Sequence, residues 1–166
     1  MFGIGIIGCG KIAQVRHIPE YNDNPDAKLV AFYDLNTARA KALAEQYGGR
    51  AYESVEALLA DPNVDAVSVC SANASHAEIT VAALEAGKHV MCEKPMAKTA
   101  EDARAMVAAA KRTGKTLTIG YQNRFRPDSL YLKKCCEAGD LGEVYYARAH
   151  AIRRRAVPTW GVFLDE

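Results

Sequence analysis

The sequence has little that would assign it to a membrane, to nucleic acid or to a secreted class. It has no apolar run near the roughly 20 residues that a membrane-spanning helix needs. Lys and Arg number 21 against 20 Asp and Glu, which leaves a formal net charge of +1 and no electrostatic reason to expect nucleic acid as a partner. The N-terminal MFGIGIIGCG lacks a basic leader, so we expect no signal peptide and a cytoplasmic protein.

Metal-ligand and disulfide patterns are also missing. The five cysteines include no CxxC pair and their number is odd; they are Cys9, Cys70, Cys92, Cys135 and Cys136. The four histidines share no ligand-like spacing with them. We therefore interpret the cysteines as small buried apolar residues in a reducing compartment, and we predict no metal site.

What the sequence does contain is a regular alternation of short apolar runs and alanine-rich helical stretches. The apolar runs predict strands at 2–7, 28–33, 65–70, 88–93 and 115–120, with a shorter one near 50–52. The stretches between them predict helices at about 11–22, 36–47, 53–60, 75–87 and 99–113. Strands that alternate with helices indicate an α/β fold, a doubly wound parallel sheet with helices on both faces.

The pattern changes after residue 121. A helix at about 128–138 leads into GEVYYARAHAIRRR (142–155), which reads as an alternating strand without partners in the chain. We therefore predict two domains: residues 1–121 form a dinucleotide-binding domain, and residues 122–166 form the truncated start of an α+β substrate domain.

The first strand runs directly into a glycine loop, Gly8-Cys9-Gly10-Lys11-Ile12-Ala13. This GxGxxA pattern is typical of Rossmann-type dinucleotide sites when it follows a strand and opens a helix, as it does here. The first glycine allows a tight turn, the second lets a pyrophosphate approach the backbone, and the small third residue lets helix and strand pack closely. Phosphate oxygens would then meet the free N–H groups at the helix N-terminus.

An acid follows the second strand, where dinucleotide-binding folds bind a ribose. Asp34 is placed to accept hydrogen bonds from the adenosine ribose hydroxyls, and its charge repels the extra phosphate of NADP. Leu35 beside it offers no charge to bind that phosphate. We therefore expect NAD as the cofactor, with NADP as an alternative because Arg39 could reach a phosphate. Asp34 could instead serve only as a helix N-terminal acid.

The other conspicuous polar residues also follow predicted strands. They stand in CSANASH (70–76), CEKP (92–95) and GYQNRFRP (120–127). Because ligands bind beyond the carboxyl ends of parallel strands, these segments are expected to line one site. Ser71 and Asn73 suit a loop beside a cofactor, whereas His76 could either reach the cofactor or simply pack.

Glu93 and Lys94 are an unusual charged pair at the end of a core strand. Glu93 could accept hydrogen bonds from ribose hydroxyls on the nicotinamide side. Lys94 is the candidate catalytic acid/base, because a partly buried ammonium group beside the positive ring of oxidised NAD could exchange a proton near neutrality. Taken alone, a lysine in a loop is more often a solvated surface residue, and its position is what favours the catalytic reading.

At this point the motifs resemble a known family. GIIGCGKIA, FYDLN, CSANASHAEITVAALEAGKHVMCEKPMAKT and GYQNRFRP together resemble the N-terminal part of the Gfo/Idh/MocA oxidoreductases over essentially all of residues 1–127. The resemblance implies a two-domain NAD(P)-dependent dehydrogenase that moves a hydride between nicotinamide and a secondary alcohol of a sugar, polyol or inositol-like substrate. It also implies a homo-oligomer for the full-length protein. Family members usually have well over 300 residues, so we expect this chain to be the cofactor-binding part and inactive alone.

The resemblance also assigns roles to individual residues. It places Lys94 at the substrate hydroxyl in proton transfer and Glu93 near the nicotinamide ribose. Cys70 to Asn73 would run along the cofactor, and Gln122 to Phe125 would lie close to its nicotinamide end. The Asp and His that complete the family's catalytic group would follow residue 166.

Two other functions compete with the dehydrogenase reading. The same family resemblance covers a non-catalytic NAD(P)-binding regulator, although such a protein would not need the lysine. The basic segment 148–155 could contact nucleic acid, but strand alternation would divide its arginines between two faces and no set of stacking aromatics accompanies them. We therefore expect no nucleic-acid partner.

Overall fold

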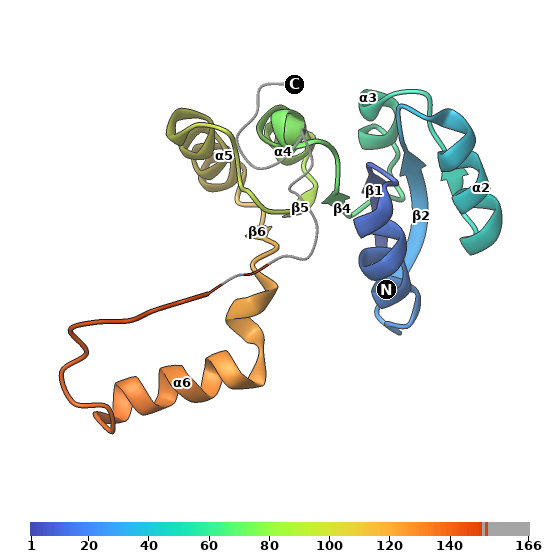
Figure 1. The fold of residues 1–166 in the computed structure, drawn as a ribbon. Coiled ribbons are helices and arrows are strands. Elements are labelled where there is room, and N and C mark those ends of the chain that lie inside the picture. Colours follow the sequence, from blue (N-terminus) through green and yellow to red (C-terminus); the bar gives the residue numbers. More distant parts are fainter. Residues whose placement is uncertain (151, 153–166) are drawn as a thin grey trace. The chain divides into compact units, whose positions relative to one another are not determined.

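The computed structural model describes residues 1–150 and 152 and divides the chain into two compact units. The first unit contains Met1–Gly120, and the second begins at Tyr121. Figure 1 shows the elements of each unit along the chain. The two units are described separately below.

A six-stranded parallel sheet forms the centre of the first unit. Its strands are β1 (Phe2–Ile7), β2 (Ala27–Tyr33), β3 (Arg50–Ala51), β4 (Ala66–Val69), β5 (His89–Cys92) and β6 (Leu117–Ile119). They lie in the order β3-β2-β1-β4-β5-β6, so β2 and β3 lie on one side of β1 and β4, β5 and β6 follow on its other side. This is the order of a classic Rossmann fold, so the predicted fold class is confirmed. Each strand predicted within residues 1–121 is present, with ends that differ by at most two residues.

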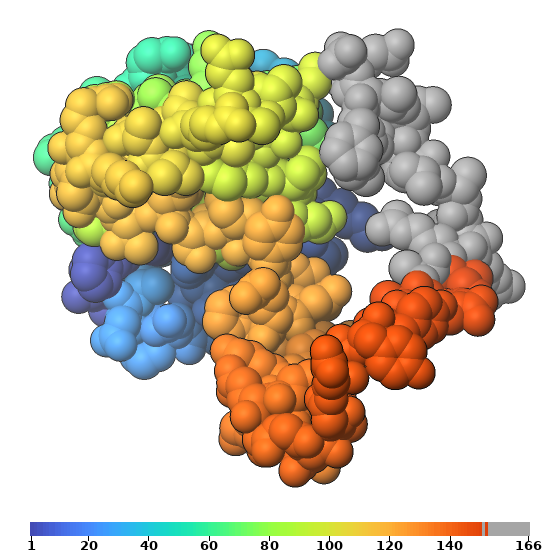
Figure 2. All heavy atoms as spheres, turned by 90° about the vertical axis from the view of Figure 1, so that its left-hand side faces the viewer, coloured from blue at the N-terminus to red at the C-terminus, as the bar shows by residue number. Residues whose placement is uncertain are grey.

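Helices cover both faces of this sheet. One face packs on η1 (Ala13–His17, a π-helix), α1 (Ile18–Asn22) and α2 (Thr37–Tyr47). The other packs on α3 (Val55–Leu59), α4 (His76–Glu85) and α5 (Ala100–Thr113). Figure 2 looks onto α5, whose yellow atoms lie beside those of α4. Within the part of the chain that the structure describes, no helix combines the length and apolarity that a membrane crossing requires.

Alternation along the strands sends successive side chains to opposite cores. Ile6 of β1 packs in the cluster with η1, α1 and α2, whereas Ile7 packs in the cluster with α3, α4 and α5. In β4, Val67 and Val69 belong to the second of these clusters, so Ser68 between them faces the opposite side. A polar residue therefore sits in the core beneath the glycine loop, a position that matters for the site.

Sequence signals for helix starts match the structure at α2 and α5. The side chain of Asn36 accepts a hydrogen bond from the Arg39 N–H, which caps α2. Thr99 accepts from the Asp102 N–H and donates to the Asp102 carboxylate, which caps α5. These local bonds fix where each helix begins and hence where each preceding loop ends.

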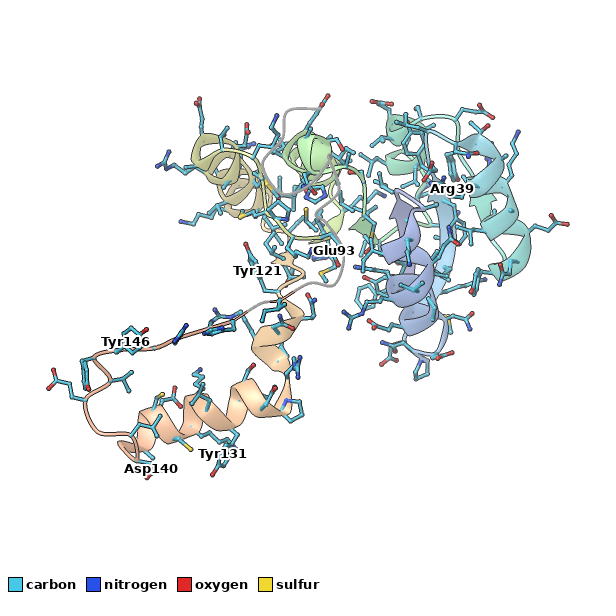
Figure 3. All side chains as sticks on the ribbon, in the orientation of Figure 1. Arg39, Glu93, Tyr121, Tyr131, Asp140 and Tyr146 are labelled. Atoms are coloured by element: carbon cyan, nitrogen blue, oxygen red, sulfur yellow. The ribbon has the colours of Figure 1, made fainter. Side chains whose placement is uncertain are left out.

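The second unit has no buried core among its described residues. It contains η3 (Gln122–Phe125) and α6 (Pro127–Ala138), and large apolar side chains on it are exposed, Tyr131 and Tyr146 among them (Figure 3). The strand predicted from residue 142 is not formed over 142–150, because no partner strand in the described chain offers it hydrogen bonds. The rest of that predicted strand, apart from Ile152, lies outside the described residues.

Candidate dinucleotide-binding site

The two glycines of the glycine loop, Gly8 and Gly10, differ in whether the fold itself requires them. Gly8 has φ +90°, and a Cβ there would lie 2.6 Å from the backbone of both Cys70 and Ser71. The fold itself therefore requires glycine at position 8. Gly10 has no such constraint, since a Cβ added there would meet no atom within 4 Å. The open space above Gly10 fits a ligand that approaches the backbone, as a pyrophosphate does in this type of loop.

The residues after Gly10 begin the helix and anchor it. Lys11 is exposed and Ile12 half-buried, while Ala13 is fully buried where the helix meets the sheet. The small side chain of Ala13 thus allows the close helix–strand packing expected from the motif. The Gln14 side-chain amide donates to the Cys9 carbonyl at 2.8 Å, which braces the loop from within the helix.

Asp34 ties the loop to the end of β2. Its Oδ2 accepts a hydrogen bond from the Cys9 N–H at 2.7 Å, and its Oδ1 accepts from the Asn36 N–H at 2.7 Å. The Arg39 guanidinium lies 3.4 Å from Oδ2 at the start of α2, where Figure 3 labels it. Asp34 therefore acts at a helix start, as the competing interpretation expected, and also holds the glycine loop. Leu35 next to it is 91% exposed.

The loop after β4 passes beside Gly8. Cys70 is buried, and its N–H donates to the Ile7 carbonyl at 2.7 Å. Ser71 and Asn73 are half-buried, and Asn73 begins the short 3-10 helix η2 (Asn73–Ser75). The Ser75 hydroxyl donates to the Ser71 hydroxyl at 2.8 Å, so the turn is braced by its own side chains.

His76 packs within the protein. The residue is 1% exposed, and its Nδ1 and Nε2 lie 2.8 Å and 3.2 Å from the carbonyl oxygens of Pro95 and Ser71. With both ring nitrogens directed at backbone, the structure supports the packing interpretation rather than a contact with the cofactor. The ring joins the loop after β4 to the loop after β5, which is a structural task.

Glu93 lies at the end of β5 and points into the first unit (Figure 3). Its Oε1 lies 2.9 Å from His17 Nε2, and its Oε2 accepts from the Lys94 N–H at 3.0 Å. Burial raises the pKa of Glu93, but the hydrogen bonds from His17 and from the Lys94 N–H outweigh it, and the net pKa is below its usual value. A Cβ at Gly120 would meet this carboxylate at 3.3 Å, so the glycine leaves room for it.

Lys94 presents its side chain to solvent. Residues 1–150 and 152 do not supply the partial burial that the sequence analysis expected for its ammonium group. The Lys94–Pro95 peptide bond is cis, an arrangement that the sequence left open. Lys94 still follows the strand end beside Glu93, at the same edge of the sheet as the glycine loop.

Cys9, Cys70 and Cys92 are buried thiols, as expected, whereas Cys135 is half-buried and Cys136 exposed on α6, so the burial expected for those two was wrong. Burial raises the pKa of Cys9 and Cys70 to about 12 and that of Cys92 to about 11. Because a thiolate is the nucleophilic and metal-binding form, these residues are chemically inert near neutral pH. Among the residues that the structure describes, no group of three His, Cys, Asp or Glu could hold a metal ion.

The first unit gathers the predicted residues at one edge. Gly8, Asp34, Cys70, Glu93 and Gly120 directly follow β1, β2, β4, β5 and β6, whose carboxyl ends share that edge. Gln122 belongs to the second unit and is exposed, so its expected place near the nicotinamide end stays a prediction.

Two residues of this region escaped the sequence analysis. His17 and Ser68 are buried, and His17 Nδ1 lies 2.7 Å from the Ser68 hydroxyl while Nε2 contacts Glu93. The available signal was a serine at the centre of an otherwise apolar strand, AVSV, and a histidine inside the first helix. Neither signal indicates the other, because 51 positions separate them.

Comparisons with known proteins agree with this geometry. A family model described as "Oxidoreductase family, NAD-binding Rossmann fold" matches residues 2–121. D-glucoside 3-dehydrogenase of Escherichia coli K12 is 44% identical over 164 residues, which make up 98% of this chain and 47% of that protein. Myo-inositol 2-dehydrogenase of Thermotoga maritima is 35% identical over an alignment of 170 residues, which covers 98% of this chain and 50% of the relative.

A solved structure shares the fold. The 3-ketoreductase of Actinomadura kijaniata in complex with NADP matches with a TM-score of 0.78 and 33% identity, over 86% of this chain and 45% of that one. The chain spans about half the length of the curated relatives it matches. Sheet order, glycine loop and family match agree, and the chain belongs to the Gfo/Idh/MocA family of NAD(P)-binding oxidoreductases.

Proposed function

We propose that this chain is the cofactor-binding part of an NAD(P)-dependent dehydrogenase that acts on a secondary alcohol of a sugar, polyol or inositol-like substrate. The observation that carries the proposal is the contrast within the glycine loop. The protein's own packing requires glycine at position 8. At position 10 it does not, because a Cβ added to Gly10 would have no protein atom within 4 Å. A loop that keeps this space beside a helix N-terminus suits a pyrophosphate.

The residues of the chain divide the work of binding between them. Backbone N–H groups from Gly10 onward would contact the pyrophosphate, and the remaining lone pairs of Asp34 would accept from the adenosine ribose hydroxyls. Glu93 would accept from the second ribose. Ser71 and Asn73 would line the path between them. When bound, the nicotinamide supplies hydride transfer.

Lys94 would provide the proton chemistry. Its ammonium group stands at the strand end next to Glu93, where a substrate hydroxyl beside the nicotinamide would lie. In the direction of alcohol oxidation, the neutral amine accepts the hydroxyl proton as the hydride leaves the carbon; in reduction the ammonium donates it. The substrate domain, which we propose begins at residue 122, belongs to the same catalytic machinery by this proposal.

NAD is the proposed cofactor, with NADP as the weaker ligand. The Asp34 carboxylate is fixed by two backbone N–H groups and cannot easily turn away from a 2′-phosphate. The nearest cation, Arg39, is already within 3.4 Å of that carboxylate. Exposed Leu35 adds no positive charge.

The experiment that tests the proposal is a titration of the chain with NADH and with NADPH, followed by the fluorescence of the reduced nicotinamide. We expect NADH to bind more tightly than NADPH. In the matched variant Gly10→Ala, the free energy of urea unfolding should change by less than about 1 kcal/mol, because the new methyl group meets no protein atom and the difference between glycine and alanine at a helix start is of that order. NADH affinity should fall at least about tenfold, because the new methyl group fills the pyrophosphate space.

Three outcomes would decide between readings. Binding that is lost in Gly10→Ala while the fold is kept supports the proposed site. Failure of the folded wild-type chain to bind either nucleotide would contradict it. Binding in a longer protein that contains this chain, without oxidation of any sugar or polyol and without an effect of Lys94→Ala, would favour the non-catalytic regulator instead.

A further inference from the structure

A line of buried polar side chains reaches Glu93 from inside the first unit. His17 places Nδ1 2.7 Å from the Ser68 Oγ and Nε2 2.9 Å from the Glu93 Oε1. Ser68 is 0% exposed and His17 6% exposed. Burying polar side chains costs free energy that apolar side chains would not cost, so a buried polar line at this position indicates a function.

The π-helix explains how His17 reaches this position. In η1 the Ile18 N–H donates to the Ala13 carbonyl, five residues earlier, so the turn is one residue wider than in an α-helix. Ala13 and His17, the first and last residues of η1, are both buried. The wide turn lets a small residue pack on the sheet while a large ring reaches β4 and β5. Such turns recur at functional sites.

The chemistry of the partners fixes the direction of each bond. An ionised carboxylate only accepts, so the proton on His17 is at Nε2 and is donated to Glu93. Nδ1 then accepts from the Ser68 hydroxyl. Every donor in the line thus points toward the Glu93 carboxylate.

The same three residue types form the nucleophilic triads of hydrolases, but this arrangement cannot work as one. Ser68 lies in the middle of β4 and is wholly buried, so no substrate can reach its oxygen. Its hydroxyl faces the histidine that in turn faces the acid, so the acid is the group to which the line leads. The buried polar line therefore serves Glu93 and not Ser68.

Glu93 depends on these donors for its charge. The titratable groups that influence its pKa are His17 and the Lys94 ammonium. The Glu93 charge in turn helps to raise the pKa of the buried thiols of Cys70 and Cys92, both neutral near pH 7. Burial alone raises the pKa of Glu93, and the hydrogen bond from His17 is the largest of the influences that lower it. Without His17 one carboxylate oxygen would lose its buried donor, and the protonated form would be favoured.

We propose that His17 is a positioning residue whose Nε2–H holds the Glu93 carboxylate in the orientation that accepts the ribose hydroxyls of a bound nicotinamide cofactor, with Ser68 fixing the ring tautomer. This inference rests on the proposed function for the identity of the ligand. It adds a residue of the first helix to a site otherwise made of strand ends.

The test is the pH dependence of NADH binding by the whole chain, between pH 5 and pH 8, for wild type, His17→Leu and His17→Gln. Gln carries an amide N–H near the position of the histidine Nε2, so it restores the donor that Leu removes. Wild-type affinity should be nearly constant over this range. In His17→Leu it should be about tenfold weaker at pH 8, the effect of one lost hydrogen bond to a charged group, and should weaken further as the pH falls.

His17→Gln should recover most of the affinity and the flat profile, which a merely structural role for the ring would not predict. If folded His17→Leu keeps the wild-type affinity and profile, the proposal is wrong. It is also wrong if the Leu variant loses affinity equally at every pH and Gln restores nothing. Ser68→Ala provides a second variant, which keeps the Nε2–Glu93 bond and should weaken NADH binding less than His17→Leu.

A measurement without nucleotide separates this inference from the proposed function. The carboxyl carbon of Glu93, followed by ¹³C NMR, should titrate at a higher pH in His17→Leu than in wild type and His17→Gln. If wild type binds no nucleotide, the proposed function fails, and with it the ligand of Glu93; the titration then still decides whether His17 controls this carboxylate. Equal titration midpoints in all three proteins would overturn the positioning role.

Discussion

In the glycine-loop half of the site, residues 8–13 with Asp34, the geometry is set by main-chain groups. In the Glu93 half, His17, Ser68 and Glu93, it is set by buried side chains. Asp34 accepts its two shortest hydrogen bonds from the backbone of Cys9 and Asn36. Glu93 accepts one bond from the Lys94 N–H, but its shortest comes from a histidine ring that is itself held by a serine. Main-chain donors stay protonated at any pH, but side-chain donors can be changed by titration or mutation.

The difference indicates separate tasks for the two halves. A rigid loop suits a part of the ligand that stays the same through a reaction, such as a pyrophosphate. A carboxylate oriented by side chains suits the part where the orientation of a ring must be fixed more finely. Fold stability and ligand affinity should therefore respond differently to substitutions in the two halves.

The largest expected effect is on stability, from Gly8→Ala in the glycine-loop half. Alanine at φ +90° is strained, and its Cβ would lie 2.6 Å from the backbone of Cys70 and Ser71, which cannot yield as a flexible side chain would. We expect the free energy of unfolding to fall by about 3 kcal/mol, measured by urea denaturation. Gly10→Ala is the control, since its Cβ meets nothing. Equal losses in the two variants would contradict the distinct roles of the glycines.

The glycine-loop half was predictable because its residues are neighbours in the sequence. The spacing of Gly8, Gly10 and Ala13 after a strand carries the turn, the open space and the packing in six consecutive positions. Asp34 follows the next strand and so is found by the same rule. The parallel sheet with helices on both faces also followed from the alternation of elements, whereas the strand order came from the structure.

The Glu93 half was predicted only in part because its contacts join distant positions. Glu93 was expected at the site, but His17 is 76 residues away from it, and the π-turn that directs the ring inward has no sequence signal that periodicity could reveal. His76 is a case that the sequence left open, since a histidine near a strand end could contact the cofactor or pack, and in the fold both ring nitrogens face backbone carbonyls. The strand expected from residue 142 is not formed over 142–150, because the described chain offers it no partner strand.

Buried thiols connect the two halves and predict a common alkaline weakness. Cys9 belongs to the glycine loop, while Cys70 and Cys92 follow or end the strands beside Glu93; burial raises all three pKa values from 9.0, to about 12 for the first two and about 11 for Cys92. Between pH 9 and these values the unfolded chain loses thiol protons that the folded chain keeps. Stability is therefore fully present below pH 9 and falls as the pH rises.

The effect should be about 1 kcal/mol for each buried thiol at pH 10, measured as the free energy of urea unfolding at pH 8, 9 and 10. Cys9→Ala and Cys70→Ala should each reduce the slope above pH 9, by similar amounts in the two halves. Exposed Cys136 provides the matched control, and Cys136→Ala should leave the slope unchanged. An unchanged slope in both buried variants would show that other groups cause the alkaline loss.

The smallest expected effect tests whether the glycine-loop half alone selects the cofactor. Leu35 is 91% exposed beside Asp34, so an arginine there adds a cation for a 2′-phosphate without disturbing the core. In Leu35→Arg, NADPH should bind roughly fivefold more tightly, about 1 kcal/mol for an exposed ion pair, and NADH should be unaffected. Leu35→Gln, of similar length but without charge, is the control. The gain should decrease with added salt, because an exposed pair is screened. If both nucleotides gain equally, the new side chain contacts a part that they share, and the selection of NAD must then come from elsewhere than the charge beside Asp34.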